Sequence, residues 1–415
     1  MASQKRIVKL SSIIASNTTT LNNFLVENNL PEPSFEADAL WALPIPDDNV
    51  DVKAARIAII DSCIELQALV TGPKELLRYD AVAYVSVRII LRLKLDKSFL
   101  VGASTSFEAM AKVSGLSVMN VRRVVRHAIL CHRFFQEKKP GVITHSALTA
   151  VLAGDALTRN ALIVQLQEFA PAGTKAADAL ENWPNSEENN ETGFSLANNS
   201  TKSMYDIFAL DPGRGSRFGT LFSRPDEPFH MLLDNYPWHD VETFVDVGGS
   251  HGSIAVALAE RFPHIKCVVQ DLPDTVVEGA SRLAPALKDR VEFMAHDFFT
   301  AQAATADVYY FRSIFHNWSD KYCIKILQAL IPALKHGARI IIHERMLPPH
   351  DALASADAKP VIKMDILMLQ LLNAQQREAE EWLELFRRAD SRYRYIGAKQ
   401  PKGGVRWIIE ARWDG

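Results

Sequence analysis

A run of small residues follows a short apolar stretch in FVDVGGSHGS, residues 244–253. Apolar, β-branched residues that end in glycines predict a buried strand followed by a tight turn. The next residues, SIAVALAERFP, carry apolar side chains at helical spacing, so we expect a helix to begin directly after the turn. A helix N-terminus at a glycine turn presents backbone N–H groups to a ligand. The glycine spacing does not fit the G-x-G-x-x-G fingerprint of NAD sites, so the loop predicts a different ligand.

The loop combines an acidic residue with small residues at alternate positions. This pattern matches the acidic-x-G-x-G-x-G loop of S-adenosylmethionine enzymes, with a serine in place of the middle glycine, at Asp246, Gly248, Ser250 and Gly252. Gly249 completes the turn and is assigned to the same cofactor site. A Gly-Gly turn between a strand and a helix also serves packing alone, so the loop by itself leaves both interpretations open.

Two later strands are expected to end in side chains that suit a nucleoside. The strand in HIKCVVQDLPDTV ends at Asp271, at the distance where α/β nucleotide folds place a carboxylate that binds the ribose. Leu272 follows and is assigned to the same site. The strand in VEFMAHDFF ends in Asp297 and Phe298, an acceptor and an apolar surface that suit an adenine. An Asp before Leu-Pro is about as often a turn residue, and only the position of Asp271 favours ribose binding.

The segment FRSIFHNWSD, residues 311–320, contains the candidate for acid–base chemistry. Methyl transfer to oxygen needs two reactants held in line and an acceptor hydroxyl that loses its proton. His316 is the candidate base, since an unperturbed imidazole pKa of about 6.5 suits a phenolic or enolic proton near neutral pH. A lone histidine is more often a structural residue. The position of His316 after the fourth strand, where the ligand loops meet, favours catalysis.

The elements that position these residues alternate between strand and helix from residue 244 onward. Such alternation predicts an α/β, Rossmann-like, mostly parallel sheet with its ligands at the carboxyl edge. The chain has 415 residues, of which 48% are hydrophobic, so two domains with ample cores are expected.

The set of motifs resembles the class I S-adenosylmethionine-dependent O-methyltransferases of the caffeate and flavonoid type and their fungal secondary-metabolism relatives. The resemblance covers most of the chain and rests on FVDVGGSHGS, VVQDLPD, MAHDFF, FRSIFHNWSDKYCIKILQALIPAL and LLNAQQREAEEW. It implies S-adenosylmethionine as cofactor, His316 as catalytic base and a hydroxyl of a hydrophobic aromatic or polyketide-type metabolite as methyl acceptor. It also implies a helical, winged-helix dimerisation domain ahead of the catalytic domain, and therefore a homodimer.

The same resemblance assigns three further residues around the base. Glu344, in HERML, matches one of the family's two supporting glutamates, whereas Gln376, in NAQQREAEEW, replaces the other. A glutamine can hydrogen-bond an imidazole but cannot stabilise imidazolium by charge, so we expect a weaker base than in relatives with both carboxylates. Arg312 takes the place of a basic residue that contacts the cofactor, and it is assigned to the methionine carboxylate or to a substrate oxygen.

Substrate contacts are expected from segments that resemble the family's pocket. They are assigned to His145, Phe194, Tyr205, Phe208, Met231, Asn317, Met368 and Asn373. Most of the aromatic residues among them would serve equally well as ordinary core.

A second enzymatic hypothesis follows from Gln376. Some fungal proteins that resemble this family keep the cofactor but catalyse dehydration or pericyclic ring closure on polyketide-derived pyridones. In those proteins a basic residue at the Arg312 position and a histidine near the wing, here His145, polarise substrate carbonyls. The presence of His316 and Glu344 favours methyl transfer, whereas Gln376 favours the alternative.

The N-terminal half predicts helices and a small winged module. TSFEAMAKVSGLSVMNVRRVVRHAILCHRFFQEKKPGVITHS reads as helix, glycine turn, basic helix and wing. Phosphate contacts by Arg122, Arg123 and Arg126 would make the protein a DNA-binding regulator. The balanced flanking charges argue against this role. We expect a dimerisation domain at 1–155, linking helices and pocket segments at 156–235 and a catalytic domain at 236–415, with an exposed polar loop at about 181–204.

Composition narrows the partners further. A net charge of -3, from 46 basic and 49 acidic residues, gives no general attraction to nucleic acid or anionic membrane. The 4 cysteines lack C-x-x-C spacing, and no short cluster of ligands suggests a metal, so we expect reduced thiols and no metal. The N-terminus lacks the apolar core of a signal peptide, and no apolar run reaches the ~20 residues of a membrane helix. A cytoplasmic enzyme is the resulting expectation.

Overall fold

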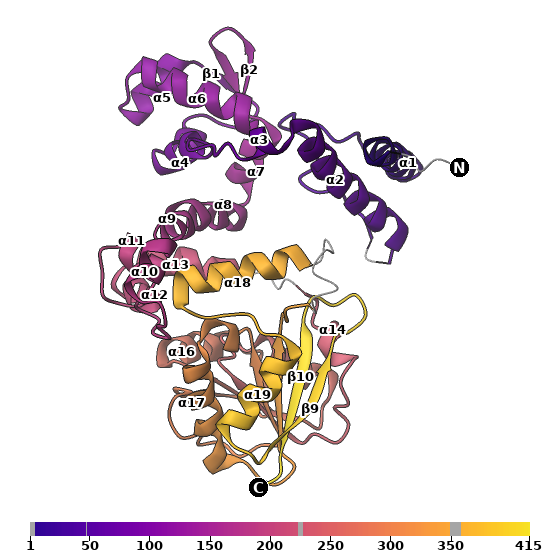
Figure 1. Ribbon diagram of the computed structural model, residues 1–415, viewed down its shortest axis with the longest axis vertical. Coiled ribbons are helices and arrows are strands. Elements are labelled where there is room, and N and C mark those ends of the chain that lie inside the picture. The colour runs from indigo at the N-terminus through magenta and orange to yellow at the C-terminus, as the bar shows by residue number, and fades with distance from the viewer. Residues whose placement is uncertain (1–4, 47, 223–226, 349–357) are drawn as a thin grey trace. The chain divides into compact units, whose positions relative to one another are not determined.

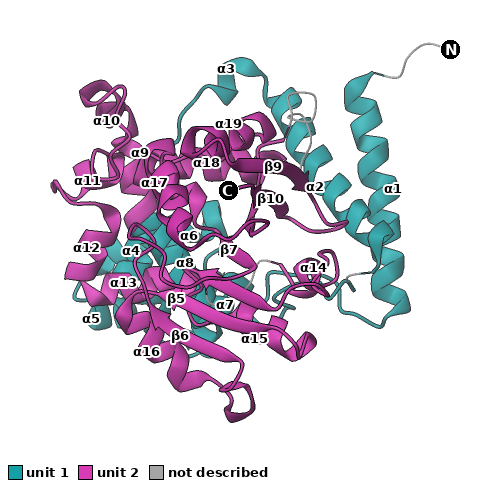
Figure 2. Ribbon diagram, turned by 90° about the horizontal axis from the view of Figure 1, so that it is seen from below, with its two compact units in different colours: residues 1–167 teal, residues 168–415 magenta. Residues whose placement is uncertain are grey.

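The computed structural model describes the chain except for residues 1–4, 47, 223–226 and 349–357. The chain divides into two compact units, Met1–Gln167 (unit 1) and Glu168–Gly415 (unit 2), which are coloured separately in Figure 2. The predicted three-part division at 155 and 235 stays a prediction.

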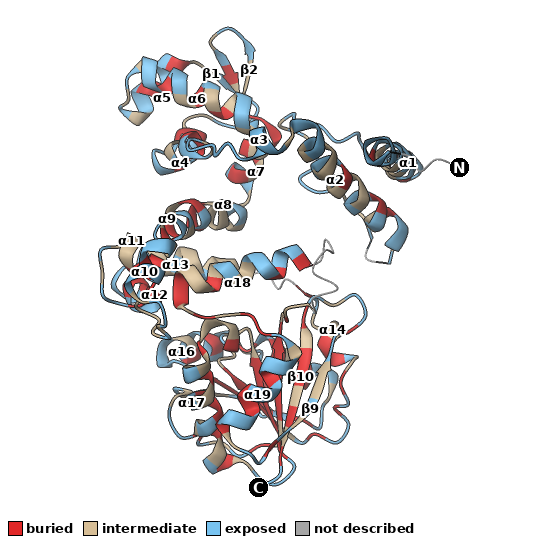
Figure 3. Cartoon of the chain, in the orientation of Figure 1, coloured by how far each residue is buried: buried red, intermediate tan, exposed pale blue. Residues whose placement is uncertain are grey.

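Unit 1 is mainly helical. Its helices are α1 (Arg6–Glu27), α2 (Val50–Thr71), α3 (Pro73–Leu76), α4 (Val85–Arg92), α5 (Phe107–Ser114), α6 (Val118–His132), α7 (Ala147–Gly154) and α8 (Ala156–Val164). Helices α1 and α2 pack against each other around Phe24, Leu25 and Val52. Most of the remaining surface of this pair is exposed, as the pale blue ribbon in Figure 3 shows.

The winged module has the order that the sequence predicts. Ser106 caps α5, Gly115 ends it with a φ of 73°, and Ser117 caps α6. A small antiparallel sheet follows, with strand order β1-β3-β2 and bounds β1 (Ser104–Thr105), β2 (Gln136–Lys139) and β3 (Val142–Thr144). Val121, Val125 and Ala128 form the buried stripe of α6, because residues four and three apart share one face of a helix.

Unit 2 contains the α/β fold. Its described residues form a sheet of seven strands in the order β6-β5-β4-β7-β8-β10-β9, in which β10 alone runs antiparallel to the other strands. The strands are β4 (Thr243–Val247), β5 (Lys266–Asp271), β6 (Val291–Ala295), β7 (Val308–Arg312), β8 (Arg339–Glu344), β9 (Tyr393–Lys399) and β10 (Trp407–Trp413). The main helices around it are α15 (Ser253–Arg261), α16 (Pro273–Arg282), α17 (Asp320–Leu330), α18 (Ala358–Leu372) and α19 (Ala379–Ala389). The predicted mostly parallel sheet is confirmed.

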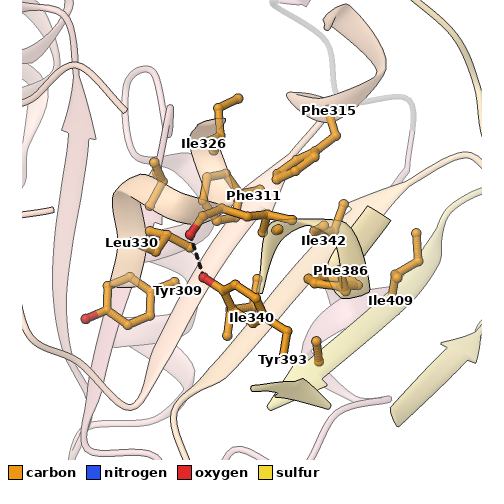
Figure 4. Packing of buried hydrophobic residues seen from close by; sticks show 14 of the residues in the cluster. Tyr309, Phe311, Phe315, Ile326, Leu330, Ile340, Ile342, Phe386, Tyr393 and Ile409 are labelled. Atoms are coloured by element: carbon orange, nitrogen blue, oxygen red, sulfur yellow. Dashed lines mark hydrogen bonds between the residues drawn. The ribbon is translucent and has the colours of Figure 1, made fainter. Parts of the chain in front are cut away.

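Alternate residues of the central strands supply two separate cores. Val245, Tyr309 and Phe311 pack with α17 and α19 in one cluster, whereas Phe244 and Tyr310 pack with α15 in the other. This alternation follows from the two-residue period of a strand, and it explains why the strands read as continuous apolar runs. Figure 4 shows the first cluster, which also includes Phe315, the residue before His316.

Short helices precede the sheet in unit 2. They are α9 (Ala170–Thr174), α10 (Ala176–Asn182), α11 (Gly193–Ala197), α12 (Met204–Leu210), α13 (Pro212–Gly219) and α14 (His230–Leu233), and a π-helical turn at Gln165–Phe169 leads into them. The predicted exposed loop at 181–204 is wrong in part, because α11 lies within it and is buried. An added Cβ at Gly193 would lie 2.4 Å from the Ala172 carbonyl oxygen, so glycine permits this close packing. The polar composition of the flanking residues concealed this short helix.

Candidate active site

The predicted ligand-binding residues follow strands that end at one edge of the sheet. Strands β4, β5, β7 and β8 run parallel, and at their carboxyl ends lie Gly248, Asp271, Arg312 and Glu344. Because parallel strands place their carboxyl ends together, these four positions share one edge, as expected for ligand sites in open α/β sheets. The ribbon in Figure 1 shows unit 2 with this sheet and the helices around it.

The glycines of the 248–252 loop allow close contacts with neighbouring side chains. Gly248 has a φ of 71°, and an added Cβ there would lie 2.7 Å from Ile314 Cδ1 and 3.8 Å from Phe298 Cε1. Gly252 has a φ of 75°, and an added Cβ would lie 2.9 Å from the ring of Phe293. The loop therefore requires glycine both for its backbone and for the space beside it.

The N–H groups of this loop have partners other than those that we expected. The amides of Gly248 and Gly249 donate to the Gln270 carbonyl at 2.8 and 3.1 Å, and the Ser250 amide donates to Asp271 Oδ2 at 2.8 Å. The first part of the loop is thus hydrogen-bonded to the end of β5. These three N–H groups therefore have their acceptors within the protein. Ser250 has a φ of 53°, a left-handed conformation that glycine adopts more readily.

The Asp271 carboxylate is held by two backbone amides. Its Oδ2 accepts from Ser250 N–H and its Oδ1 accepts from Leu272 N–H at 2.7 Å. An ionised carboxylate offers about four acceptor positions, so each oxygen keeps one lone pair for a hydroxyl. The two backbone bonds fix the carboxylate in place, and the exposed Leu272 lies directly beside it.

Asp246 interacts electrostatically with Arg312 and packs against the glycine loop. Asp246 is buried, and its desolvation raises the pKa to about 7, while Arg312 lowers the pKa and Asp271 raises it. An added Cβ at Gly249 would lie 2.5 Å from Asp246 Cγ, so the carboxyl group packs directly under the loop. Asp246 therefore packs against the loop, and Arg312 supplies the positive charge that acts on Asp246.

The predicted adenine-binding residues lie after β6. Asp297 Oδ1 accepts from the Phe299 amide at 3.0 Å and shapes the turn. Phe298 packs edge-on against Phe299 and Trp318, with ring centroids 4.9 and 6.1 Å apart. The contacts of Phe298 thus connect the glycine loop with the segment that carries His316.

A carboxylate holds the backbone on one side of His316. Glu344 Oε1 accepts from the Phe315 amide at 2.6 Å, and Glu344 Oε2 accepts from the His316 amide at 3.0 Å. Glu344 is buried, and its desolvation raises the pKa to about 7 against the effect of Arg377 and the backbone amides. Glu344 therefore supports the base through the main chain, whereas the resemblance had placed it among the groups that steer the imidazole.

A buried arginine holds the same segment from the other side. Arg377 donates to the Phe315 carbonyl at 3.1 Å, to the Trp318 carbonyl at 2.9 Å and to Asp320 Oδ1 at 3.0 Å. Its side chain is 0% exposed. The Phe315–His316 segment is thus fixed between a carboxylate and a guanidinium group, both of which form charge-assisted hydrogen bonds to the main chain.

Gln376 is the side chain that contacts the imidazole. Its side-chain Nε2 lies 3.0 Å from His316 Nδ1, and its main-chain N–H donates to Asp365 Oδ1 at 2.7 Å. In this orientation the glutamine NH₂ donates to Nδ1, so the ring proton lies on Nε2; the reverse amide orientation would place it on Nδ1. Glutamine therefore accommodates either tautomer, whereas a carboxylate would accept only the Nδ1–H form.

His316 is held in its neutral form. Desolvation lowers its pKa to about 4, and the positive charges of Arg406, Arg377 and Arg345 act in the same direction, opposed by the Ser313 carbonyl. Arg406 donates to Ser313 Oγ at 2.9 Å and so lies beside the segment that carries His316. At neutral pH the imidazole is available as a base or as a hydrogen-bond donor, but its affinity for a proton is low.

Comparisons with known proteins decide the family. A family model for an O-methyltransferase domain matches residues 220–392. The chain is 38% identical to the O-methyltransferase AMT9 of Alternaria alternata over 98% of both chains. The chain belongs to the O-methyltransferase family. The resemblance inferred from the motifs is confirmed, and this O-methyltransferase is an enzyme that acts on a small molecule.

Two solved structures share its fold. The crystal structure of OxaC is 19% identical, with a TM-score of 0.77 and a coverage of 98% of both chains. A structure described as a pericyclic reaction enzyme is 22% identical, with a TM-score of 0.68, covering 86% of this chain and 94% of that chain. Identities at this level show the fold alone. The whole-chain match to AMT9 favours methyl transfer over the pericyclase alternative.

The basic helix of unit 1 offers little support for DNA binding. Arg126 forms a bidentate pair with Glu137 at 2.9 and 2.7 Å and lies over the Phe107 ring, as does Arg122. The hydrogen bonds from Arg126 lower the pKa of Glu137 to about 2. In this O-methyltransferase, Arg126, one of the three arginines assigned to phosphate contacts, is therefore already paired with a carboxylate of strand β2.

Several predicted substrate contacts lie in a packed cluster of unit 2. Phe194, Phe208 and Met368 are buried against one another, with the two rings 5.4 Å apart. Asn373 donates both amide hydrogens to the main chain, at the Glu188 and Glu191 carbonyls, 2.9 and 2.8 Å away. These contacts are internal, and substrate binding by these residues stays a prediction.

The other predicted substrate contacts have more varied surroundings. Asn317 donates to the Ser313 carbonyl at 2.9 Å, next to the base. Tyr205 is exposed on α12, and Met231 lies on α14. His145 belongs to unit 1, where it is buried between Phe99 and Phe135. The structure places Asn317 beside the base, and substrate binding by Tyr205, Met231 and His145 stays a prediction.

Two arginines that sequence reasoning missed are central to the geometry. Arg377 follows Gln376 directly, and Arg406 precedes β10. The sequence did contain a signal for Arg377. This arginine lies in the NAQQREAEEW motif beside Gln376, and it can form an ion pair with Asp320, the aspartate that follows FHNWS. No local pattern distinguishes Arg406 from an ordinary surface residue.

In the part of the chain that the structure describes, no group of three or more His, Cys, Asp or Glu side chains could hold a metal ion. Cys63, Cys131, Cys267 and Cys323 are free thiols.

Among the described helices, no single one is long and apolar enough to cross a membrane. One pair of helices, Ala147–Gly154 and Ala156–Thr174, meets that test by length and composition, but the chain bends by 104° between them.

Proposed function

We propose that this enzyme transfers a methyl group from S-adenosylmethionine to a hydroxyl of a hydrophobic aromatic or polyketide-type metabolite. The observation that carries the proposal is the fixed His316 segment at the edge of the sheet where the glycine loop and Asp271 also lie. Family membership supports the reaction type, and the apolar and aromatic residues near this edge support the substrate class.

The residues at the strand ends fit the cofactor. Asp271 keeps two acceptor positions for ribose hydroxyls, and Leu272 and Phe298 offer apolar surface for the adenine. Arg312 provides a positive charge for the methionine carboxylate. When bound, the cofactor supplies an activated methyl group on a positively charged sulfur.

His316 supplies the imidazole that acts on the acceptor oxygen. Glu344 and Arg377 hold its main chain, and Gln376 orients its ring. Fixed orientation is the main contribution that a protein makes to a displacement between two bound reactants. Glu344 and Gln376 are positioning residues in this account.

The test uses methyl-labelled S-adenosylmethionine with the purified protein and trichlorophenol as a probe. We expect label in the product with the wild-type protein. His316→Ala should keep cofactor affinity and lower turnover by about 10²-fold, the cost of losing a positioned base or a donor to an oxyanion. Unchanged turnover in His316→Ala would remove His316 from the site.

The homodimer and the cytoplasmic location belong to the same proposal. Helix α2 exposes Ile57, Ile60 and Ile64 at 44%, 44% and 55%, at a spacing that places them on one face. An apolar face of this kind favours a protein partner over solvent, and a second copy of the chain fits the family resemblance. A monomeric mass by light scattering at micromolar concentration would contradict the dimer.

A further inference from the structure

Resting on the proposed methyl transfer, we propose that the methyl acceptor is an acidic hydroxyl compound that is largely ionised at neutral pH, and that His316 meets it as a neutral imidazole. Electron-poor phenols and the enols of 1,3-dicarbonyl compounds belong to this class, whereas simple phenols do not. The inference rests on which charges face the imidazole.

No carboxylate among the described residues is placed to stabilise a protonated His316 ring. The side chain at Nδ1 is the uncharged Gln376, at 3.0 Å. Glu344 uses its two oxygens on the amides of Phe315 and His316. Asp365 Oδ1 accepts from the main-chain N–H of Gln376 at 2.7 Å. A proton on the imidazole would therefore lack the charged partner that normally supports it.

The charged groups that shift the pKa of the ring most are positive. Arg377 follows α18, Arg406 precedes β10 and Arg345 follows β8, and all three disfavour imidazolium. Arg377 and Arg406 also hold the segment itself, at the Phe315 carbonyl and Ser313 Oγ. Such surroundings repel a further positive charge on the imidazole and attract an oxyanion. The Ser313 carbonyl acts in the opposite direction and raises the pKa of the ring.

The proton affinities agree with these contacts. His316 has a pKa of about 4, whereas a simple phenol such as tyrosine has a pKa of about 10. Proton transfer from such a phenol to this ring would be unfavourable by about 10⁶-fold, because each pKa unit is a factor of ten. An acceptor that has already lost its proton to solvent avoids this cost.

The bond changes balance without a proton transfer to His316. The ionised oxygen of the acceptor forms a bond to the methyl carbon with its own electron pair. The bond between that carbon and sulfur breaks, and its electron pair stays on sulfur, which becomes neutral. In the tautomer with the ring proton on Nε2, which Gln376 accommodates by donating to Nδ1, the ring serves as a hydrogen-bond donor to the oxyanion.

One arm of the test needs no substrate. Protein labelled with nitrogen isotope in its histidines is titrated by NMR, and the His316 signal is assigned by its loss in His316→Asn. We expect the ring to stay neutral down to about pH 5. In Gln376→Glu the apparent pKa should rise by at least one unit, because a carboxylate at Nδ1 favours imidazolium. A wild-type ring that titrates near 6.5 would overturn the inference.

The second arm compares two acceptors, para-nitrophenol as the acidic probe and para-cresol as the weakly acidic probe. We expect the wild type to methylate para-nitrophenol at least 100-fold faster than para-cresol at neutral pH. Gln376→Glu should narrow this ratio at least tenfold by raising the para-cresol rate. Gln375→Glu is the matched control, since the Gln375 side chain points to Asp320, 3.4 Å away, and its ratio should stay unchanged.

The outcomes separate this inference from the proposed function. Comparable rates for both probes would overturn the acidic-acceptor inference and leave methyl transfer intact. A ratio that falls equally in Gln375→Glu and Gln376→Glu would also overturn it, because the effect would then be general. Conversion of either probe or of the natural acceptor without gain of a methyl group would instead refute the proposed function. Melting temperatures of both variants within a few degrees of the wild type verify that they are folded.

Discussion

Replacing Arg377 with methionine should destabilise unit 2 by about 3–5 kcal/mol, the usual cost of removing one partner from a buried ion pair. The structure shows where this cost arises. The carbonyls of Phe315 and Trp318 each lose a donor, at 3.1 and 2.9 Å in the wild type. A buried carbonyl without a donor costs about 1–3 kcal/mol. Asp320 contributes less, because Arg388 still pairs with its Oδ2 at 3.0 Å.

Thermal unfolding followed by circular dichroism measures this loss. A domain of this size loses about 2–4 °C of melting temperature for each kcal/mol, so the Arg377→Met transition should fall by roughly 6–20 °C. Arg388→Met is the matched control, since its side chain is 43% exposed and its pair with Asp320 contributes about 1 kcal/mol or less. Equal melting temperatures for the two variants would refute the reasoning, because they would show that the buried hydrogen bonds to the loop contribute nothing.

Four further predictions follow from the site. Gly248→Ala should weaken cofactor binding by at least tenfold in calorimetry, since the added Cβ lies 2.7 Å from Ile314 Cδ1 at a φ of 71°; unchanged affinity would show that the loop can shift freely. Asp271→Ala should weaken binding by a few kcal/mol at most, through two lost ribose bonds, and an unaltered Kd would remove Asp271 from the site. His316 has a pKa of about 4 in the folded protein, below its unfolded value of about 6.5. The stability that the neutral ring contributes is therefore complete above pH 6.5 and is lost as the pH falls toward 4. His316→Phe should flatten the pH dependence of the unfolding free energy between these two values, and an identical slope would contradict the low pKa. A chelator should leave turnover unchanged, and activity that needs added magnesium would overturn the metal-free account.

The strand ends could be predicted because they depend on local patterns. Apolar runs that end in Asp271 and in FVDVGGSHGS indicate both the strand and the edge at which it stops. His316 could be placed near that edge for the same reason. The parallel order of strands then brings these residues together without any information on side-chain packing.

The contacts of the base could not be predicted in the same way. Whether Glu344 reaches the imidazole or the amides of the segment depends on a backbone turn at Ile314–Phe315 that no residue pattern specifies. Arg406 lies 93 positions from the Ser313 side chain that it contacts. Short-range patterns carry no signal for such distant pairs. The buried helix α11 was missed for a related reason, since its five residues are too few for a helical period.

The central claim is methyl transfer to an oxygen, and the mass of the product tests it most directly. The purified protein is incubated with methyl-labelled S-adenosylmethionine and an extract of its own source organism, and the products are analysed by mass spectrometry. We expect a product that has gained one labelled methyl group on oxygen, with formation strongly reduced in His316→Ala. A product of unchanged mass, or one formed by loss of water without any methyl gain, would contradict the account and favour a cofactor-assisted cyclisation.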